Sequence, residues 1–370
     1  MKKNIIVLSG DGIGPEVVNQ ALRVIDAVNE SFGHTFVLKK ELIGAASIDA
    51  FGIPLTNEVI EKCKKSDAIL LGAIGHPKYD NDFTTLIRPE QGLLKLRKAL
   101  SLYANIRPIH IYDISKNASP LKEEIINGVD LLIFRELTGG LYFGEKYLSE
   151  DGNTASDICI YTRKEIYRIS KLAFDCAMTR RKKLLLVDKA NVLESSRLWR
   201  KVVQEMSESY PDVSVEYMYV DNAAMQLMIN PRKFDVVLTE NLFGDILSDL
   251  ASVITGSIGL LPSSSIGLNT AIFEPIHGSY PQGSGKDIAN PFATILSVAM
   301  MYEYFNLHQE SAVIRKSVAW AMKNNLVTRD LNENEYFFCG QVGEYISNFI
   351  ELKGDLKLNK INISNLNILL

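Results

Sequence analysis

Cysteine is scarce in this 370-residue chain. The chain also lacks a long apolar run and an excess of positive charge. The four cysteines form no CxxC pair, which favours reduced, buried thiols in a cytoplasmic protein. They are Cys63, Cys159, Cys176 and Cys339. The longest uncharged apolar region, residues 291–302, is too short to cross a bilayer, and the apolar part of the N-terminus is too short for a signal peptide. A net charge of −4 gives no electrostatic reason to bind nucleic acid or a membrane surface.

The rest of the composition, 46% hydrophobic and 23% charged, is typical of a globular protein, and the length allows two domains or one large α/β unit. Apolar runs rich in β-branched residues alternate with stretches of helical periodicity. We expect strands over residues 5–8, 36–42, 68–71, 103–111, 131–134, 183–187, 213–220, 234–238 and 271–273. We expect helices over residues 15–28, 58–64, 91–100, 163–180, 195–208, 222–229 and 242–254. This alternation predicts an α/β fold with a largely parallel sheet.

Four segments depart from this alternation. Residues 142–161 are polar and read as an excursion from the core. Residues 256–267 and 277–290 are rich in glycine and read as loops, and residues 353–370 are rich in Asn and Lys and read as an appended tail.

Two acids interrupt the apolar helix expected after the strand at 234–238. Asp245 and Asp249 are four residues apart, so their carboxylates lie one turn from each other on one helix face. They either face solvent or form a site for a hard cation, which prefers oxygen ligands. Asp221, at the end of another predicted strand, is either a helix N-cap or a third carboxylate for the same cation.

Several other residues stand where open α/β sheets place ligands, at the ends of predicted strands. Arg107 and Arg135 do so, and with Arg97 they suit a di- or tricarboxylate. Each alone is more typical of a surface ion pair, except that Arg135 follows the apolar run 131–134, where a cation must be paired. Lys189 follows a strand and is either a general base or an ordinary loop lysine. Tyr142 alone is more typical of a packing aromatic than of an acid.

A glycine-rich segment, Gly10–Glu16, follows the first predicted strand. It does not fit the dinucleotide-binding fingerprint, because Pro15 and Glu16 stand where glycine or alanine is required. It is equally consistent with a tight turn and with a ligand loop.

Taken together, these stretches resemble the isocitrate/isopropylmalate dehydrogenase family of β-decarboxylating enzymes. The matching stretches run in family order over about residues 4–350. They are GDGIGPEV, RPEQGLLKLRKAL, ANIRPI, FRELTGGLYFGE, VDKANVLESSRLWR, LTENLFGDILSDLAS, GSIGLLPS, FEPIHGS and IANP. GLLKLRK and RELTGGLYFGE look like the isopropylmalate branch of the family.

The resemblance implies two α/β domains that are not a standard Rossmann fold. The first would comprise residues 1–102 plus 255–370 and carry the cofactor loops. The second, residues 103–254, would carry the metal and catalytic residues, the dimer interface and an arm at about 145–161. The resemblance also implies a homodimer with shared active sites.

The implied reaction is the oxidative decarboxylation of 2R,3S-3-isopropylmalate to 4-methyl-2-oxopentanoate with reduction of NAD, a step of leucine biosynthesis. By resemblance, Lys189 removes the hydroxyl proton and Tyr142 protonates the enol at C3. Asp245 and Asp249, with the partner's Asp221, would bind Mg²⁺ or Mn²⁺.

The resemblance assigns further contacts residue by residue. The substrate would contact Arg97, Arg107, Arg135, Asp221, Leu93 and Val192. The cofactor would contact Pro77, Glu90, His277, Gly278, Ser279, Gln282, Ile288 and Asn290. The family usually has an Asp where Gln282 stands, and a glutamine cannot repel a 2′-phosphate as a carboxylate does, so the preference for NAD over NADP is less secure. The chain also has Gly75-His76-Pro77-Lys78-Tyr79 where the family commonly has Gly-Gly-Pro-Lys-Trp.

Two alternatives remain open at this point. A related family enzyme would act on D-malate, tartrate or homoisocitrate, and a small or polar residue in place of Leu93 would favour it. A non-catalytic regulatory subunit would lack Tyr142, Lys189 or one of the aspartates, and all are present.

Overall fold

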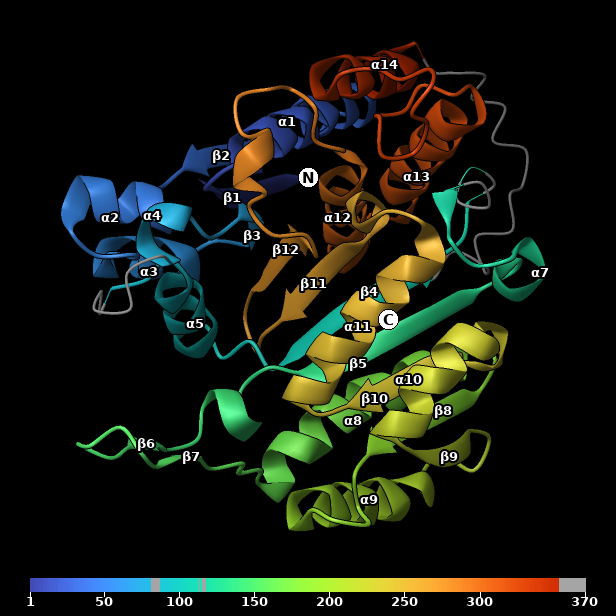
Figure 1. Ribbon diagram of the computed structural model, residues 1–370. Helices are drawn as coiled ribbons and strands as arrows, with labels where there is room; N and C mark the ends of the chain where they lie inside the picture. Colours follow the sequence, from blue (N-terminus) through green and yellow to red (C-terminus); the bar gives the residue numbers. More distant parts are fainter. Residues whose placement is uncertain (81–86, 113, 115–117, 353–370) are drawn as a thin grey trace. The chain divides into compact units, whose positions relative to one another are not determined.

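The computed structural model describes residues 1–80, 87–112, 114 and 118–352 (Figure 1). The chain divides into two compact units. Unit 1 comprises Met1–Ser101, Tyr112–Pro120 and the chain from Thr255 onward, and unit 2 comprises Leu102–Ile111 and Leu121–Ile254. Among the described helices, none has the length and apolar content needed to span a bilayer.

The sheet of unit 1 has the strand order β2-β1-β3-β12-β11. Its strands are β1 (Lys2–Gly10), β2 (Thr35–Lys40), β3 (Ala68–Ala73), β11 (Pro262–Ile266) and β12 (Ala271–Pro275). β1 is parallel to β2 and β3, β12 is parallel to β3, and β11 is antiparallel to β12. All residues of β3 and β12 are buried, as the apolar runs at 68–71 and 271–273 predict.

The helices of unit 1 are α1 (Gly14–Phe32), α2 (Ala45–Phe51), α3 (Asn57–Lys64), α4 (Pro77–Asp80), α5 (Glu90–Ala99), α12 (Phe292–Tyr304), α13 (His308–Lys323) and α14 (Cys339–Glu351). Short 3₁₀ turns occur at Ile258–Leu260 and Pro281–Gly283. α1 buries an apolar stripe that includes Val17, Ala21 and Val28, as predicted, and packs on α14 and α12. α12 is buried along nearly its whole length, because it packs on β11, β12 and α13.

The sheet of unit 2 has the strand order β4-β5-β10-β8-β9. Its strands are β4 (Ala104–His110), β5 (Asp130–Glu136), β10 (Val236–Thr239), β8 (Lys183–Asp188) and β9 (Ser214–Tyr219). β4 is antiparallel to β5, and the other neighbours are parallel. A separate hairpin of β6 (Lys146–Leu148) and β7 (Ala155–Asp157) extends away from the rest of unit 2, with every residue exposed (Figure 1).

The helices of unit 2 are α7 (Glu123–Ile126), α8 (Arg163–Thr179), α9 (Glu194–Ser207), α10 (Val220–Ile229) and α11 (Asn241–Thr255). Short 3₁₀ turns occur at Gly140–Tyr142 and Pro231–Lys233. α8 begins at a capping box of Thr162 and Glu165 and packs on β5, β10, β8 and α9. α10 packs on β8 and β9.

The strands are largely parallel, as expected, and the two antiparallel pairs are β4–β5 and β11–β12. The structure corrects the expected fold in three places. β11 lies within the expected loop 256–267, because its serines are buried and Ser263 Oγ donates to the Glu274 carbonyl at 3.0 Å. The sequence reading also missed α2, and it assigned Tyr112–Pro120 to the second domain. The proposed tail lies outside the described residues.

Candidate active site

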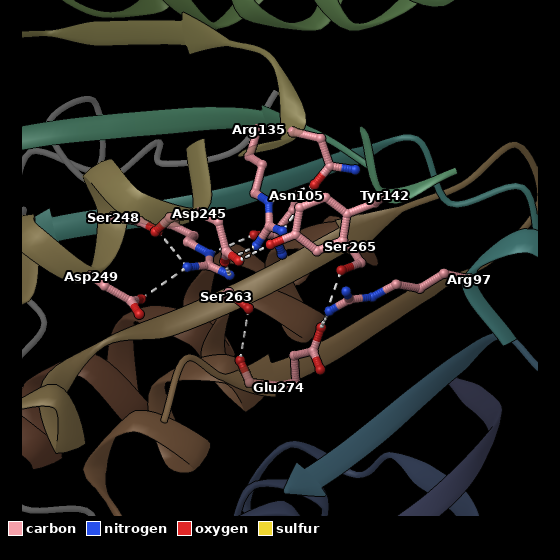
Figure 2. A network of polar contacts seen from close by, with 12 residues as sticks. Arg97, Asn105, Arg135, Tyr142, Asp245, Ser248, Asp249, Ser263, Ser265 and Glu274 are labelled. Carbon is pink, nitrogen blue, oxygen red and sulfur yellow. Dashed lines mark hydrogen bonds and ion pairs between the residues drawn. The ribbon is translucent and has the colours of Figure 1, made fainter. Parts of the chain in front are cut away.

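Asp245, one turn into α11, lies at the centre of a buried polar cluster in unit 2. Arg135, the penultimate residue of β5, is 3% exposed and donates from Nη1 to Asp245 Oδ1. Tyr142 donates from its hydroxyl to Asp245 Oδ2 at 2.6 Å. Burial and the hydrogen bond to Asp245 raise the pKa of Tyr142, so its phenol keeps its proton at neutral pH. Figure 2 shows these three side chains directed toward one another.

A second arginine, Arg107 on β4, faces the same side of α11. Its guanidinium lies 3.6 Å from Asp245 and 3.5 Å from Asp249, and it also donates to Ser248. Both arginines are buried, which overturns the expectation of a surface ion pair for Arg107 and agrees with the expectation that Arg135, after its apolar run, is paired. The Asp249 side chain is 66% exposed, and partial desolvation raises its pKa, which Arg107 lowers and Asp245 raises further. Two carboxylates thus face two cations, so the simple solvent-face alternative is wrong for Asp245.

The two carboxylates of α11 supply oxygen donors one turn apart, which fits a hard divalent cation. Within the described ranges, however, no three acidic, histidine or cysteine side chains are grouped closely enough to hold a metal ion. Asp221 therefore does not complete the site within one chain.

Asp221 instead pairs with Lys189. Lys189 lies in the turn after β8, and its Nζ is 2.7 Å from Asp221 Oδ1. This ion pair lowers the pKa of Asp221. Asp221 is the second residue of α10 and Tyr219 occupies the N-cap position, so the N-cap alternative is wrong. Val192, three residues after Lys189, is 63% exposed.

Unit 1 carries the remaining predicted substrate residues. Arg97 on α5 is largely buried and donates from Nη2 to Glu274 Oε1 at 3.0 Å, and Figure 2 shows both side chains. Leu93, one turn earlier on α5, is half-buried. Glu274, on β12, also accepts from Ser265 Oγ at 3.2 Å.

Several predicted cofactor residues of unit 1 lie on segments that approach one another closely, at the starts of α4 and α5 and in the loop after β12. A Cβ at Gly75, which has a φ of +125°, would lie 3.0 Å from Glu90 Oε1 and 3.3 Å from Ser279 Oγ. Only glycine brings the backbone this near to both side chains. Gly75 precedes Pro77, which begins α4.

Asp11 braces these loops, and the sequence reading missed it. Its buried carboxylate accepts hydrogen bonds from the backbone N–H groups of Ala45 (3.0 Å), Ala46 (3.1 Å) and Gly75 (3.0 Å). Desolvation raises the pKa of Asp11, while these three donors oppose the rise. Ile13 N also donates to the Ser279 carbonyl at 2.8 Å. In the structure, Gly10–Glu16 thus forms a tight turn that ties the loops together.

His277 is the residue of these loops best placed for a polar ligand. Its side chain is buried, Nδ1 lies 3.0 Å from the Gly278 carbonyl, and Nε2 has no hydrogen-bond partner among the described residues. Burial lowers the pKa of His277, so the imidazole is neutral. A buried polar atom without a partner is costly, and a cofactor group that bonds to it would remove that cost.

The other predicted cofactor residues differ in exposure. Asn290 is buried, donates to Asp330 at 2.9 Å and accepts from Phe292 N at 3.0 Å. Gln282 is exposed on a 3₁₀ turn, and Ile288 is half-buried. Of the predicted cofactor residues, His277, Ser279, Gln282 and Asn290 thus offer neutral polar side chains, and Glu90 offers a carboxylate.

Paired acids, buried arginines and a protonated tyrosine on α/β units define an enzyme site for a small carboxylate-bearing substrate. The chain belongs to the isocitrate/isopropylmalate dehydrogenase family, whose model matches residues 4–346. It is 52% identical over 352 residues to a 3-isopropylmalate dehydrogenase of Bacteroides fragilis (strain YCH46), covering 95% of this chain and 99% of that protein. It is 53% identical over 336 residues to a 3-isopropylmalate dehydrogenase of Halalkalibacterium halodurans, covering 90% and 92% of the two chains.

Solved structures give the same family at lower identity. The isocitrate dehydrogenase of Methylococcus capsulatus has a TM-score of 0.85 at 33% identity, covering 94% of this chain and 99% of that one. A β-decarboxylating dehydrogenase of Thermococcus kodakarensis has a TM-score of 0.78 at 35% identity, with 96% and 98% covered. The expected fold class is therefore confirmed.

Proposed function

We propose that this chain oxidatively decarboxylates 2R,3S-3-isopropylmalate to 4-methyl-2-oxopentanoate, with reduction of NAD, in leucine biosynthesis. The observation that carries the proposal is the convergence of Arg107, Arg135 and Tyr142 on Asp245. Buried guanidinium groups bind carboxylates strongly, and a protonated phenol beside them can donate a proton. Relatives at 52–53% identity that carry the name 3-isopropylmalate dehydrogenase support this substrate.

The roles of the residues follow from their chemistry. Arg107 and Arg135 would bind a substrate carboxylate, and in unit 1 Arg97 would bind another. Lys189 Nζ, which lies 2.7 Å from Asp221 Oδ1, would accept the proton of the C2 hydroxyl. Tyr142 Oη would donate a proton to C3 after CO₂ leaves, since the raised pKa of Tyr142 keeps that proton available.

Two groups would supply chemistry that side chains lack. Asp245 and Asp249, with the partner's Asp221, would hold Mg²⁺ or Mn²⁺, which polarises the C2 oxygen when bound. The loops of unit 1, through His277, Ser279 and Asn290, would bind NAD, which accepts the hydride from C2. Leu93, with the partner's Val192, would contact the isopropyl group.

A homodimer with shared sites is supported by exposed apolar side chains in unit 2. Val192 is 63%, Met225 50%, Ile229 58% and Ile246 56% exposed. Met225 and Ile229 lie one turn apart on α10, and contiguous exposed apolar side chains mark interaction surfaces. A partner would cover them and bring its Lys189 and Asp221 to the Asp245–Asp249 pair. The scattered free cysteines support a cytoplasmic location.

The test is reduction of NAD by purified protein with Mn²⁺ and a panel of 2-hydroxy diacids. We expect 3-isopropylmalate to exceed D-malate in kcat/KM by more than about tenfold, because burying a three-carbon branch contributes about 2 kcal/mol. Leu93→Ala, which removes part of the apolar contact, should narrow that ratio. Equal or faster turnover of D-malate or tartrate by the wild type would rule out this substrate assignment.

A further inference from the structure

Asn241, the first residue of α11, connects the proposed substrate-binding arginine to the turn that carries Tyr142. Its side chain is 1% exposed. Its Oδ1 accepts from Arg135 Nε at 3.1 Å and Nη2 at 2.9 Å, and its Nδ2 donates to the Gly139 carbonyl at 3.3 Å. Gly139 directly precedes the 3₁₀ turn Gly140–Tyr142.

The backbone around Asn241 is held as firmly as its side chain. Asn241 N donates to the buried Tyr161 hydroxyl at 2.9 Å. The same phenol oxygen lies against Gly140, where an added Cβ would come within 2.3 Å of it. On the other side, Glu136 accepts from Thr138 N at 2.9 Å and Gly139 N at 2.8 Å. Asn241 and the turn of Tyr142 therefore share one scaffold.

One face of α11 accepts hydrogen bonds from all three nitrogens of the Arg135 guanidinium. Asn241, Gly244 and Asp245 are three and four residues apart and share that face. Gly244 lets the helix lie against the arginine stem, since a Cβ there would come within 2.6 Å of Arg135 Cγ. Asn241 takes the Nε–Nη2 edge and Asp245 takes Nη1. A neutral acceptor thus holds the edge at which a carboxylate would form a bidentate ion pair.

The neutrality of this acceptor has an electrostatic reason. In the preceding residue, Glu240, burial and the acids Asp188 and Glu136 raise the pKa to about 7. A further carboxylate would add to this repulsion and cancel the charge that Arg135 offers to a substrate. An amide fixes the arginine without either effect.

We propose that Asn241 is a positioning residue that orients Arg135 and the Tyr142 turn together, and that its neutrality preserves the charge of Arg135 for the substrate carboxylate. This inference rests on the proposed function for the identity of the substrate. It concerns no group that binds metal or cofactor.

Two variants separate the two parts of the proposal. Asn241→Asp keeps the acceptor for Arg135, adds a negative charge and loses the donor to Gly139, whereas Asn241→Ala removes both contacts. Asn127→Asp, at an exposed position of the same unit, is the matched charge control. With 3-isopropylmalate, NAD and Mn²⁺, we expect Asn241→Asp to raise KM at least tenfold, Asn241→Ala to lower kcat at least tenfold, and the control to match the wild type.

A second readout does not depend on activity. The ¹⁵N–¹H signal of Arg135 Nε, identified by its absence in Arg135→Lys, should exchange faster with solvent in Asn241→Ala. A KM of Asn241→Asp within twofold of wild type overturns the neutrality argument, and an unchanged Arg135 signal in Asn241→Ala overturns the positioning argument. If Asn241→Ala does not fold, the KM of Asn241→Asp alone tests the proposal, and a value within twofold of wild type overturns it. If the wild type does not turn over 3-isopropylmalate, the proposed function fails, and the Arg135 signal still tests the positioning.

Discussion

Unit 2 holds its candidate catalytic residues in two contrasting environments. Around Asp245, the two arginines are buried, and the tyrosine and the carboxylate complete a dense set of hydrogen bonds and ion pairs. The Lys189–Asp221 pair makes one short ion pair at 2.7 Å, and its side chains are 28% and 67% exposed.

This difference indicates which group is preorganised within one chain. Charges fixed in a buried site bind and stabilise without rearrangement. An exposed Lys–Asp pair contributes little by itself, because solvent screens it. In the proposed homodimer, a second copy of the chain would cover the pair and reduce this screening. Three perturbations test this comparison.

The largest effect should come from the exposed group. Lys189→Met removes the acceptor of the hydroxyl proton, so hydride transfer from C2 should slow by about 10³-fold or more. Single-turnover measurement of hydride transfer and CO₂ release would separate the steps. When the 2-keto acid is supplied directly, its decarboxylation should be much less impaired.

Two further variants sharpen this test. Lys183→Met, at the exposed start of the same strand β8, should behave as wild type. Tyr142→Phe should transfer hydride but tautomerise the enol slowly. Normal hydride transfer in Lys189→Met would refute the division of roles between the lysine and the tyrosine.

A smaller effect should follow from Asp245→Asn, in the buried cluster. The amide keeps the shape but removes the charge that a divalent cation needs, so the Mn²⁺ concentration for half-maximal activity should rise about 10- to 100-fold. Arg107 and Arg135 would also lose a charged partner, so thermal unfolding should be measured alongside. Asp212→Asn, an exposed control in the same unit, should leave both unchanged. Wild-type activity of Asp245→Asn at limiting Mn²⁺ would make the carboxylate structural.

The sequence predicted the elements of this site better than their environments. Apolar runs located β5, β8 and β10, and the four-residue spacing placed Asp245 and Asp249 on one face of α11. The burial of Arg107 could not be read from periodicity, because it depends on which strands become neighbours. Asn241 escaped notice for the same reason, since its partner Arg135 is 106 residues away along the chain. β11 was missed because a run of serines lacks the apolar signal of a strand.

The smallest effect concerns stability rather than activity. It tests whether Glu240, the residue before Asn241, is protonated in the folded chain. Glu240 is 4% exposed, and burial, followed by repulsion from Asp188 and Glu136, raises its pKa from 4.5 to about 7. Between these values the folded chain binds a proton that the unfolded chain releases. Glu240 therefore stabilises the fold least above pH 7, and the free energy of unfolding should fall as pH rises from about 4.5 to 7, by up to about 3 kcal/mol.

Glu240→Gln removes this titration, because an amide stays neutral throughout. Urea unfolding at pH 5 and pH 8 should therefore show a smaller loss of stability in Glu240→Gln than in the wild type, and Glu208→Gln, at an exposed position, should follow the wild type. Only the difference between variants is diagnostic, since burial also raises the pKa of Asp11 and Glu136. If Glu240→Gln loses as much stability between the two pH values as the wild type does, Glu240 is ionised in the folded chain. Asn241 would then follow an ionised Glu240, and the repulsion on a carboxylate at position 241 would be stronger still.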